Sequence, residues 1–298
     1  MQSFFSPENK SRFSLIFSMV IFGTIGIFRR YLPLPSGTIA LSRGIIGTLA
    51  LLLIVFLSKK GLHFSAIRKN LLLLCISGAA IGVNWILLFE AYNHTTVATA
   101  TLCYYMAPIL VILASPLLLR ERVTLRQWIC VCIALCGMVL VSGVASGGIG
   151  KDLLGILMGL GAAVLYASVV LMNKFIKEIP AYDKTVVQLG CAALVLLPYV
   201  LLAEEVNLSS LTLPVILILL GVGVLHTGIA YALYFGSIAK LSARTVAIFS
   251  YIDPVVAILL SALLLREPMG VWEITGAILI LGATVVGEWQ SGKKKRND

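Results

Sequence analysis

Charged residues are scarce in this sequence: Asp, Glu, Lys and Arg make up 12% of its 298 residues, whereas hydrophobic residues make up 59%. A soluble domain of this length would need more polar surface than such a composition provides. The few charges fall mainly in short segments between long uncharged runs. This composition excludes a soluble globular fold and leaves no room for an inserted soluble domain.

Motifs for nucleotide, redox and metal chemistry are also missing. No Walker loop occurs, and the Gly-rich segment 142–150 is not followed by a nucleotide-binding motif, so ATP-driven transport would need a separate subunit. The six cysteines form no Cys-x-x-Cys pair, and the three histidines form no cluster. Cys132 and Cys136 share a helix face, and we interpret them as small packing residues. We therefore expect no catalytic residues, no cofactor and no metal.

The sequence has long apolar runs instead. About 20 apolar residues in an α-helix cross a hydrocarbon core of about 30 Å, so each run predicts a membrane-spanning helix. The predicted fold is an all-α integral membrane protein with ten transmembrane helices. The predicted spans are 13–30, 37–57, 69–91, 97–119, 126–144, 153–175, 184–203, 213–236, 244–265 and 271–289.

Lysine and arginine predict the orientation of these helices. With a cytoplasmic N-terminus, 18 of the 23 basic residues fall in cytoplasmic segments and four in external ones, while Arg43 lies inside the second span. This bias predicts that both termini are cytoplasmic, and that the basic tail 293–296 contacts acidic lipid. The net charge of +10 could indicate nucleic-acid binding, but charge at helix ends is better explained by membrane orientation, so we expect no nucleic-acid partner. The first span lacks a convincing cleavage site and is interpreted as a retained helix.

One stretch occurs twice. Segment 104–121, "YYMAPILVILASPLLLRE", returns as 250–267, "SYIDPVVAILLSALLLRE", at an offset of 146 residues. Each half holds five spans, and because five is odd, the second copy enters the membrane from the opposite side. We therefore predict two inverted five-helix repeats, residues 1–146 and 147–298. Many secondary transporters have this architecture and bind substrate near the midplane between the halves.

The paired motifs resemble a known family. Each half contains Pro-x(11)-Arg-Glu followed by a glycine-containing span, and "ALSRGIIGTLALLL" around Arg43 is similar to the family's second span. The residues that carry the resemblance are Pro108, Glu121 and Gly137 in the first half and Pro254, Glu267, Gly276 and Gly282 in the second. In these features the sequence resembles the EamA-type transporters of the drug/metabolite transporter superfamily. The resemblance implies a multi-pass permease of the cell inner (plasma) membrane, most often an exporter of amino acids, other metabolites or drugs.

Two matched prolines lie within predicted spans. Pro108 and Pro254 each remove a backbone hydrogen bond and should kink their helices. The kinks are either tolerated irregularities, which membrane helices often contain, or hinges that open the backbone beside a cavity. Thr101, Tyr105 and Tyr251 share a face with the prolines and would line that cavity, or else pack between helices.

Three polar residues at membrane depth break the internal symmetry. Asn84, His226 and Asp253 each align with an alanine in the other half. Intramembrane ionisable groups cost about 2.5–3.5 kcal/mol for Asp, so they usually face an interior cavity. Asn84 could instead bond a neighbouring helix, and His226 could serve packing. Asp253 could bind substrate, cap the backbone beside Pro254, or couple protonation to transport, with His226 as a candidate partner.

Aromatic and cationic side chains complete the set of candidate substrate-binding residues. Trp85, Tyr166 and Tyr231 could offer ring faces to an aromatic or cationic substrate, although interfacial anchoring is the commoner role. Arg43 could bind a substrate carboxylate or snorkel to the outer surface.

These features predict a secondary transporter that exports small metabolites, such as amino acids, by alternating access between the repeats. An importer, or a facilitator without ion coupling, fits the same features. Two other function classes remain as alternatives. One is a non-transporting membrane sensor or assembly protein, which would usually carry an added soluble domain, and the other is a membrane enzyme, which would need clustered catalytic groups; the sequence shows neither feature. A channel is also an alternative, although no ring-forming motif is evident. The expected partners are a small-molecule substrate and membrane lipid, and the chain fits a monomer or a homodimer.

Overall fold

The computed structural model of the protein describes residues 7–59, 61–118, 123–141, 152–205, 207–238, 241 and 249–294. Within these ranges the chain is helical and contains no strand. The helices are α1 (Pro7–Gly23), α2 (Ile25–Arg30), α3 (Ser36–Leu57), α4 (Phe64–His94), α5 (Val97–Tyr104), α6 (Ala107–Leu118), α7 (Leu125–Val141), α8 (Leu153–Phe175), α9 (Ala181–Ala203), η3 (Leu208–Ser210), α10 (Leu213–Gly221), η4 (Val222–Ile229), α11 (Ala230–Ile238), α13 (Ile252–Leu263) and α14 (Val271–Lys294). The Arg120–Glu121 pair, segment 142–150 and residues 244–248 of the predicted ninth span lie outside the described residues.

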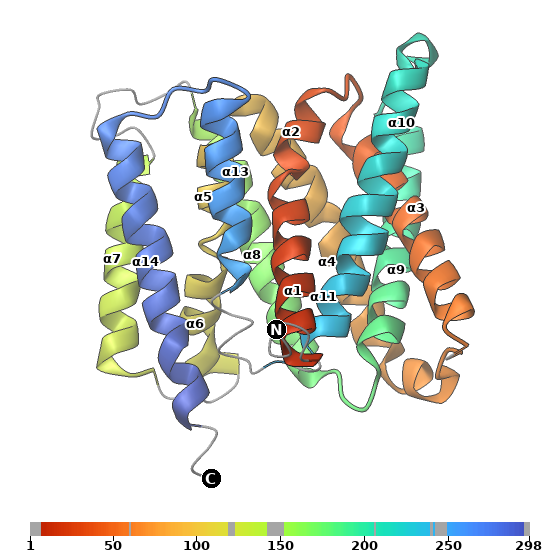
Figure 1. The fold of residues 1–298 in the computed structure, drawn as a ribbon, viewed down its shortest axis with the longest axis horizontal. Helices are drawn as coiled ribbons and strands as arrows, with labels where there is room; N and C mark the ends of the chain where they lie inside the picture. Colours follow the sequence, from red (N-terminus) through yellow and green to blue (C-terminus); the bar gives the residue numbers. More distant parts are fainter. Residues whose placement is uncertain are drawn as a thin grey trace, which may run out of the picture.

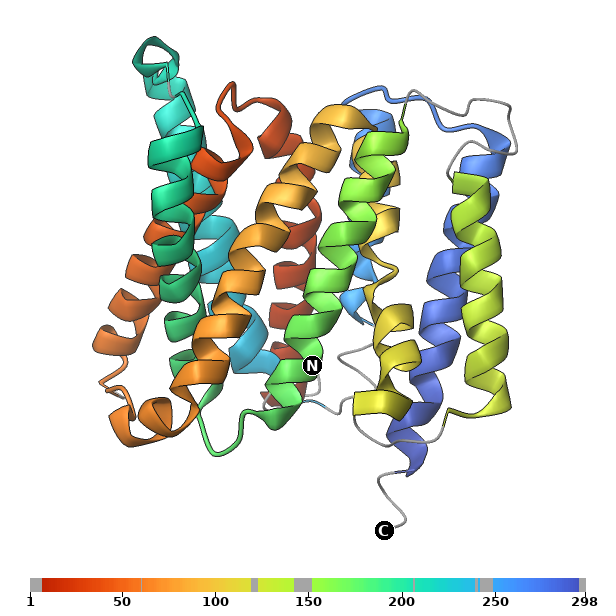
Figure 2. The same ribbon diagram turned by 180° about the vertical axis from the view of Figure 1, so that it is seen from behind.

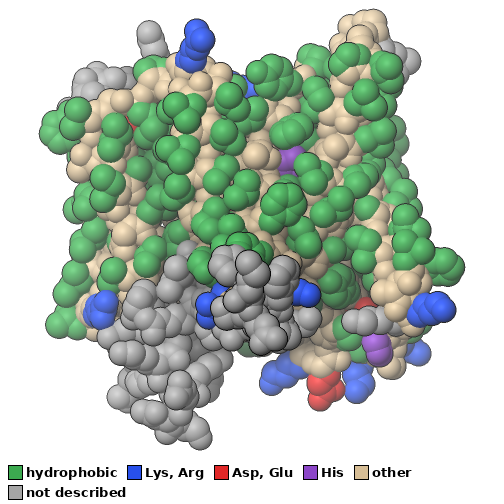
Figure 3. All heavy atoms as spheres, viewed as in Figure 1, with side chains coloured by type: hydrophobic (Ala, Val, Ile, Leu, Met, Phe, Trp, Pro, Cys, Tyr) green, Lys and Arg blue, Asp and Glu red, His purple; other side chains and the backbone are tan. Residues whose placement is uncertain are grey.

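Ten apolar helical segments lie in the described part of the chain, as the sequence predicts. Seven are long and apolar enough to cross a membrane, and three are shorter. Their outward side chains are strongly apolar: Phe56 is 78% exposed and Leu202 is 88% exposed. Figure 3 shows these side chains as a broad apolar band, with Lys and Arg at its edges and more of them at the lower edge. Lipid tails are as apolar as leucine, so such a surface is stable in a bilayer.

The two halves pack through matching pairs of helices. The third span, α4, packs against the sixth, α8, and in the same way α11 of the eighth span packs against the first span, α1. Likewise α5 and α6 lie against α8, while α13 lies against α1. Exchanging the halves exchanges the contacts, as expected for two inverted five-helix repeats. Helix α1 begins and α14 ends at the same edge of the bundle (Figures 1 and 2).

Helices α7 and α14 form a close pair at one side of the bundle (Figure 1). A Cβ atom added to Gly137 would lie 2.8 Å from the carbonyl oxygen of Gly276, and one added to Gly276 would lie 2.5 Å from that of Gly137. Two facing glycines therefore let these backbones meet, as small residues do in many membrane helix pairs.

Within the described residues, four spans are interrupted instead of forming regular helices. The first span breaks at Thr24, the fourth breaks between Tyr104 and Ala107, the eighth contains the π-helix η4, and the ninth breaks at Tyr251, three residues before Pro254. In the fourth span the sequence predicts a kink, and the chain breaks just before Pro108 because the proline ring has no N–H for the carbonyl of Tyr104. The interruptions of the first and eighth spans have no proline and no signal in the sequence. Irregular backbone at membrane depth is tolerated where it is buried in protein or lines a cavity.

Candidate substrate site

Arg43 points from α3 into the bundle and is 6% exposed. Its Nε donates a hydrogen bond to Thr227 Oγ1 at 2.9 Å, and its guanidinium carbon lies 4.3 Å from the centre of the Trp85 ring. Within the described part of the chain, no carboxylate forms an ion pair with Arg43, and its terminal nitrogens donate to no protein acceptor. The side chain therefore does not snorkel to the surface. Its free donors have the planar geometry that binds a carboxylate through two hydrogen bonds.

Asp253 lies in the first turn of α13. Its Oδ2 accepts a hydrogen bond from the Tyr105 hydroxyl at 2.7 Å. The carboxylate and Arg43 are near enough to interact electrostatically, although they form no direct ion pair. Asp253 is half-buried, so part of its surface stays accessible inside the helical bundle. The structure thus holds Arg43 and Asp253 in one region, and each has hydrogen-bonding capacity that no described residue uses.

Aromatic side chains surround the two charges. The Tyr104 and Tyr166 rings are 5.2 Å apart, the Tyr105 and Tyr251 rings are 6.5 Å apart, and Tyr231 packs edge-on against Phe22 at 5.3 Å. Tyr92 also lies within electrostatic range of both Arg43 and Asp253. We refer to the following residues as the central cluster: Arg43, Trp85, Tyr92, Tyr104, Tyr105, Tyr231 and Asp253. They come from α3, α4, α5, the break that follows α5, α11 and α13, and therefore from both repeats.

His226 does not contact Asp253. Its Nε2 lies 2.8 Å from Thr24 Oγ1 at the break in the first span, and its ring packs edge-on against Phe28 at 4.9 Å. The Thr24 hydroxyl donates its proton to the carbonyl of Ile21, so the histidine must donate to Thr24. The π-helix thereby directs His226 toward α1 and its neighbour Thr227 toward Arg43. His226 is fully buried and joins two interrupted spans.

Asn84 and the predicted hinge residues lie beside the central cluster. The Asn84 amide nitrogen donates to the carbonyl of Ala162 on α8 at 2.6 Å, which is the helix-to-helix bond that the sequence leaves as one option. Thr101 is buried within α5. Pro108 and Pro254 each fall in the first turn of a half-helix, α6 and α13, where proline fits without loss of a helical hydrogen bond.

The sequence does not single out several residues that the fold brings to the cluster. From the sequence, we would interpret Tyr92, Tyr104 and Thr227 as ordinary helix-packing residues. Tyr104 had a weak signal, because it begins the repeated stretch and precedes Tyr105. Thr227 had none, because its contact with Arg43 depends on the π-helix.

Two glutamates close one end of the bundle. Glu267, after α13, accepts hydrogen bonds from Arg30 Nη2 at 2.6 Å, from the Val97 backbone nitrogen at 2.8 Å and from the Ser261 hydroxyl. Glu204 accepts from the Gly37 and Thr38 backbone nitrogens at the start of α3. Each glutamate belongs to the second repeat and binds a helix N-terminus of the first. These hydrogen bonds hold the two halves together at this end of the bundle, which is opposite the edge where α1 begins.

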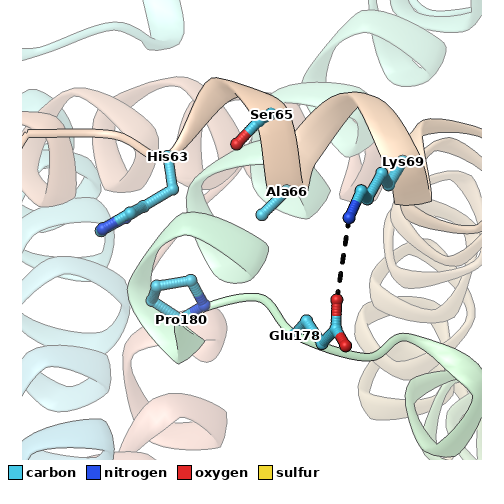
Figure 4. Close-up of a pocket in the computed structure, with 6 residues that line it drawn as sticks. All are labelled: His63, Ser65, Ala66, Lys69, Glu178 and Pro180. Carbon is cyan, nitrogen blue, oxygen red and sulfur yellow. Dashed lines mark ion pairs between the residues drawn. The ribbon is translucent and has the colours of Figure 1, made fainter.

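A surface cavity of about 360 Å³ lies at the opposite end, lined by His63, Ser65, Ala66, Lys69, Glu178 and Pro180 (Figure 4). The Lys69 Nζ is 3.8 Å from Glu178 Oε2, and both side chains are largely exposed. An exposed ion pair at this distance contributes little to the stability of the protein, and it does not by itself indicate a site for a charged ligand. This cavity lies at the edge of the bundle and contains none of the predicted site residues.

The sequence matches the EamA-like transporter family twice, over residues 10–143 and 153–286. The chain belongs to the EamA-like transporter family. Each matched segment contains five of the ten spans, which agrees with a fold of two five-helix repeats.

Several similar proteins carry transporter names. The chain is 29% identical over 268 residues to the uncharacterized transporter YxxF of Bacillus subtilis, covering 89% of this chain and 85% of that protein. It is 29% identical over 205 residues to the protein RarD of Salmonella typhi, covering 68% and 67% of the two chains. An uncharacterized transporter of Archaeoglobus fulgidus is 24% identical over 274 residues, covering 92% of this chain and 94% of that protein.

A solved crystal structure of a protein has the same fold, with a TM-score of 0.64 and 20% identity over 93% of this chain and 96% of that chain. Family membership and the apolar helices establish an EamA-type, multi-pass membrane transporter, and the family indicates a small-molecule substrate and a lipid environment.

Proposed function

We propose that this EamA-type transporter exports small metabolites that carry both an ammonium and a carboxylate group, such as amino acids. The observation behind this proposal is the separated charge pair of the central cluster. Among the residues that the structure describes, the terminal nitrogens of Arg43 have no acceptor, and Asp253 accepts a hydrogen bond from Tyr105 and forms no ion pair. A zwitterion complements both, because its carboxylate matches the guanidinium fork and its ammonium matches the aspartate. Ring faces beside the two charges suit an apolar or cationic remainder of the substrate.

The proposed mechanism is alternating access between the two repeats. Inverted repeats give two states of similar energy that face opposite sides. The interrupted first, fourth, eighth and ninth spans all contribute residues at or beside the central cluster, and Pro108 and Pro254 would act as hinges where the half-helices begin. One chain contributes both repeats, residues 1–146 and 147–298, so a monomer suffices for the cycle. The cycle needs no catalytic group, cofactor or metal.

We further propose that the protein lies in the inner (plasma) membrane with both termini in the cytoplasm. The basis is the positive charge bias at the edge where α1 begins. A reporter fused after Trp289 should report the cytoplasm, and one inserted in segment 147–150 should report the outside. If both reporters gave the same side, the odd number of spans per half would be wrong; if they gave exchanged sides, the orientation would be wrong.

Purified protein in liposomes tests the substrate class. We expect counterflow of amino acids with neutral side chains and no counterflow of nucleosides or of cations that lack a carboxylate. Arg43→Lys should raise KM about tenfold while leaving the maximal rate nearly unchanged, because lysine keeps the charge and loses the fork that binds a carboxylate. Protein-free liposomes are the control. Transport of cations without a carboxylate, unaffected by Arg43→Lys, would contradict the proposed class.

A further inference from the structure

Two cysteines of different repeats lie in contact. Cys75 on α4 and Cys191 on α9 have their sulfur atoms 3.4 Å apart. All six cysteines are described and free, and this is the one pair among them whose sulfurs are within hydrogen-bonding distance. Both residues are half-buried. They are separated by 116 positions in the sequence, so tertiary structure alone brings them together.

The helices on either side of the pair are held at close range. Gly78 lies one turn beyond Cys75, and a Cβ atom added to it would come within 2.6 Å of the Cys191 Cβ. On the same seam, Gln188 Nε2 donates to Ser77 Oγ at 2.7 Å. A glycine contact and a buried hydrogen bond thus fix the separation of α4 and α9. The packing of α4 against α9 therefore places the two thiols beside each other.

We propose that Cys75 and Cys191 form an oxidisable dithiol whose disulfide cross-links the two repeats. In the reaction, two S–H bonds break and one S–S bond forms, while two electrons and two protons pass to the oxidant. The oxidant is a membrane-permeant two-electron acceptor, such as a quinone, which becomes the hydroquinone. A disulfide has an S–S distance of about 2.04 Å, so the two sulfurs, which are 3.4 Å apart, must approach by about 1.4 Å when the bond forms.

The cross-link has a consequence for transport that rests on the proposed alternating access. Helix α4 belongs to the first repeat and contributes Trp85 and Tyr92 to the central cluster, whereas α9 belongs to the second repeat. A covalent bond between them opposes any relative movement of the repeats along this seam. Oxidation should therefore stop the cycle, and reduction should restore it.

The test uses the full-length protein in liposomes, with the exposed Cys132 and Cys136 replaced by alanine as background. Diamide, whose N=N bond accepts two electrons and two protons, is the oxidant. We expect the background protein to lose two maleimide-reactive thiols under denaturing conditions, a Cys75–Cys191 peptide to appear by mass spectrometry, and transport to fall at least about tenfold. Dithiothreitol should reverse all three changes. Cys75→Ser and Cys191→Ser should transport normally before oxidation and should not respond to diamide.

The outcomes separate this proposal from the proposed function. If no thiols are lost, the dithiol site is wrong. If the disulfide forms and transport continues at its former rate, the proposal that the cross-link prevents movement between the repeats is wrong. Both results can occur in liposomes that transport amino acids normally, and transport before oxidation reports the proposed function independently.

Discussion

Asp253→Asn is expected to reduce transport at least about tenfold and to remove its response to a pH gradient. Asparagine keeps the shape of aspartate and an oxygen that can accept the Tyr105 hydrogen bond, so the helix ends should stay in place. The variant lacks the charge that would pair with a substrate ammonium or take up a proton. Hydrogen bonds to charged groups contribute about 1.5–3 kcal/mol, which corresponds to about ten- to a hundredfold in binding.

The measurement is uptake into vesicles with and without an imposed pH gradient. Protons and substrate ammonium would compete for one carboxylate, which is the simplest basis for exchange. Tyr105 donates a hydrogen bond to this carboxylate, and Arg43, Tyr92, Tyr104 and Tyr231 lie within electrostatic range of it, whereas His226 is bonded to Thr24. Asp152→Asn, at the exposed start of α8, is the matched control. A wild-type protein that ignores the gradient would exclude coupling, and a full response in the variant would exclude Asp253 as the coupling group.

Glu267→Gln is expected to weaken closure at the end of the bundle opposite the termini. The Glu267 carboxylate is 13% exposed and joins Arg30 of α2 to the N-terminus of α5. Removing the charge of one partner leaves Arg30 without its ion pair, and breaking a largely buried pair costs about 3–5 kcal/mol. Arg30 is 31% exposed, so solvent reduces this cost. The equilibrium should shift by at least about tenfold toward states that are open at this end.

Thiol labelling from this side measures the shift. Thr101→Cys places the thiol one turn below the Glu267 contact, at a position that is 3% exposed. An impermeant maleimide should label it about tenfold faster in the presence of Glu267→Gln. Glu273→Gln, an acidic residue on α14 at the same end, should leave the rate unchanged. Equal labelling rates with and without Glu267→Gln would show that this contact does not hold the bundle closed.

The repeated Arg-Glu motif is an instructive case for prediction from sequence. The sequence marks Glu267 as part of a duplicated stretch and places it at the end of a span. It carries no indication that the carboxylate binds Arg30 and Val97, which lie 237 and 170 positions away. The motif therefore predicts the family and the topology. The contacts of Glu267 with Arg30 and Val97 depend on the packing of α13 against α2 and α5.

His226 and Asp253 are two residues that the sequence suggests as a pair and that the structure does not bring into contact. The sequence places both near the midplane without charged repeat partners, which makes a functional pair a reasonable hypothesis. In the structure the π-helix turns His226 toward Thr24, while Asp253 faces Tyr105. Depth along a span follows from counting residues, because a helix rises 1.5 Å per residue. The direction in which a side chain points also depends on helix rotation and on local departures from α geometry.

The sequence by itself determined that this protein is a ten-span, all-helical membrane transporter of two inverted repeats. Apolar run length, the matched motifs and the odd number of spans per half carry that information, because bilayer thickness and backbone hydrogen bonding restrict a chain so strongly in lipid. Tertiary structure alone decided which polar groups meet: Arg43 with Thr227, Asp253 with Tyr105, and Cys75 with Cys191. The physical reason is that helices apolar on all sides have no hydrophobic periodicity to mark a buried face. Their rotation and partners follow from close packing and a few hydrogen bonds between distant residues.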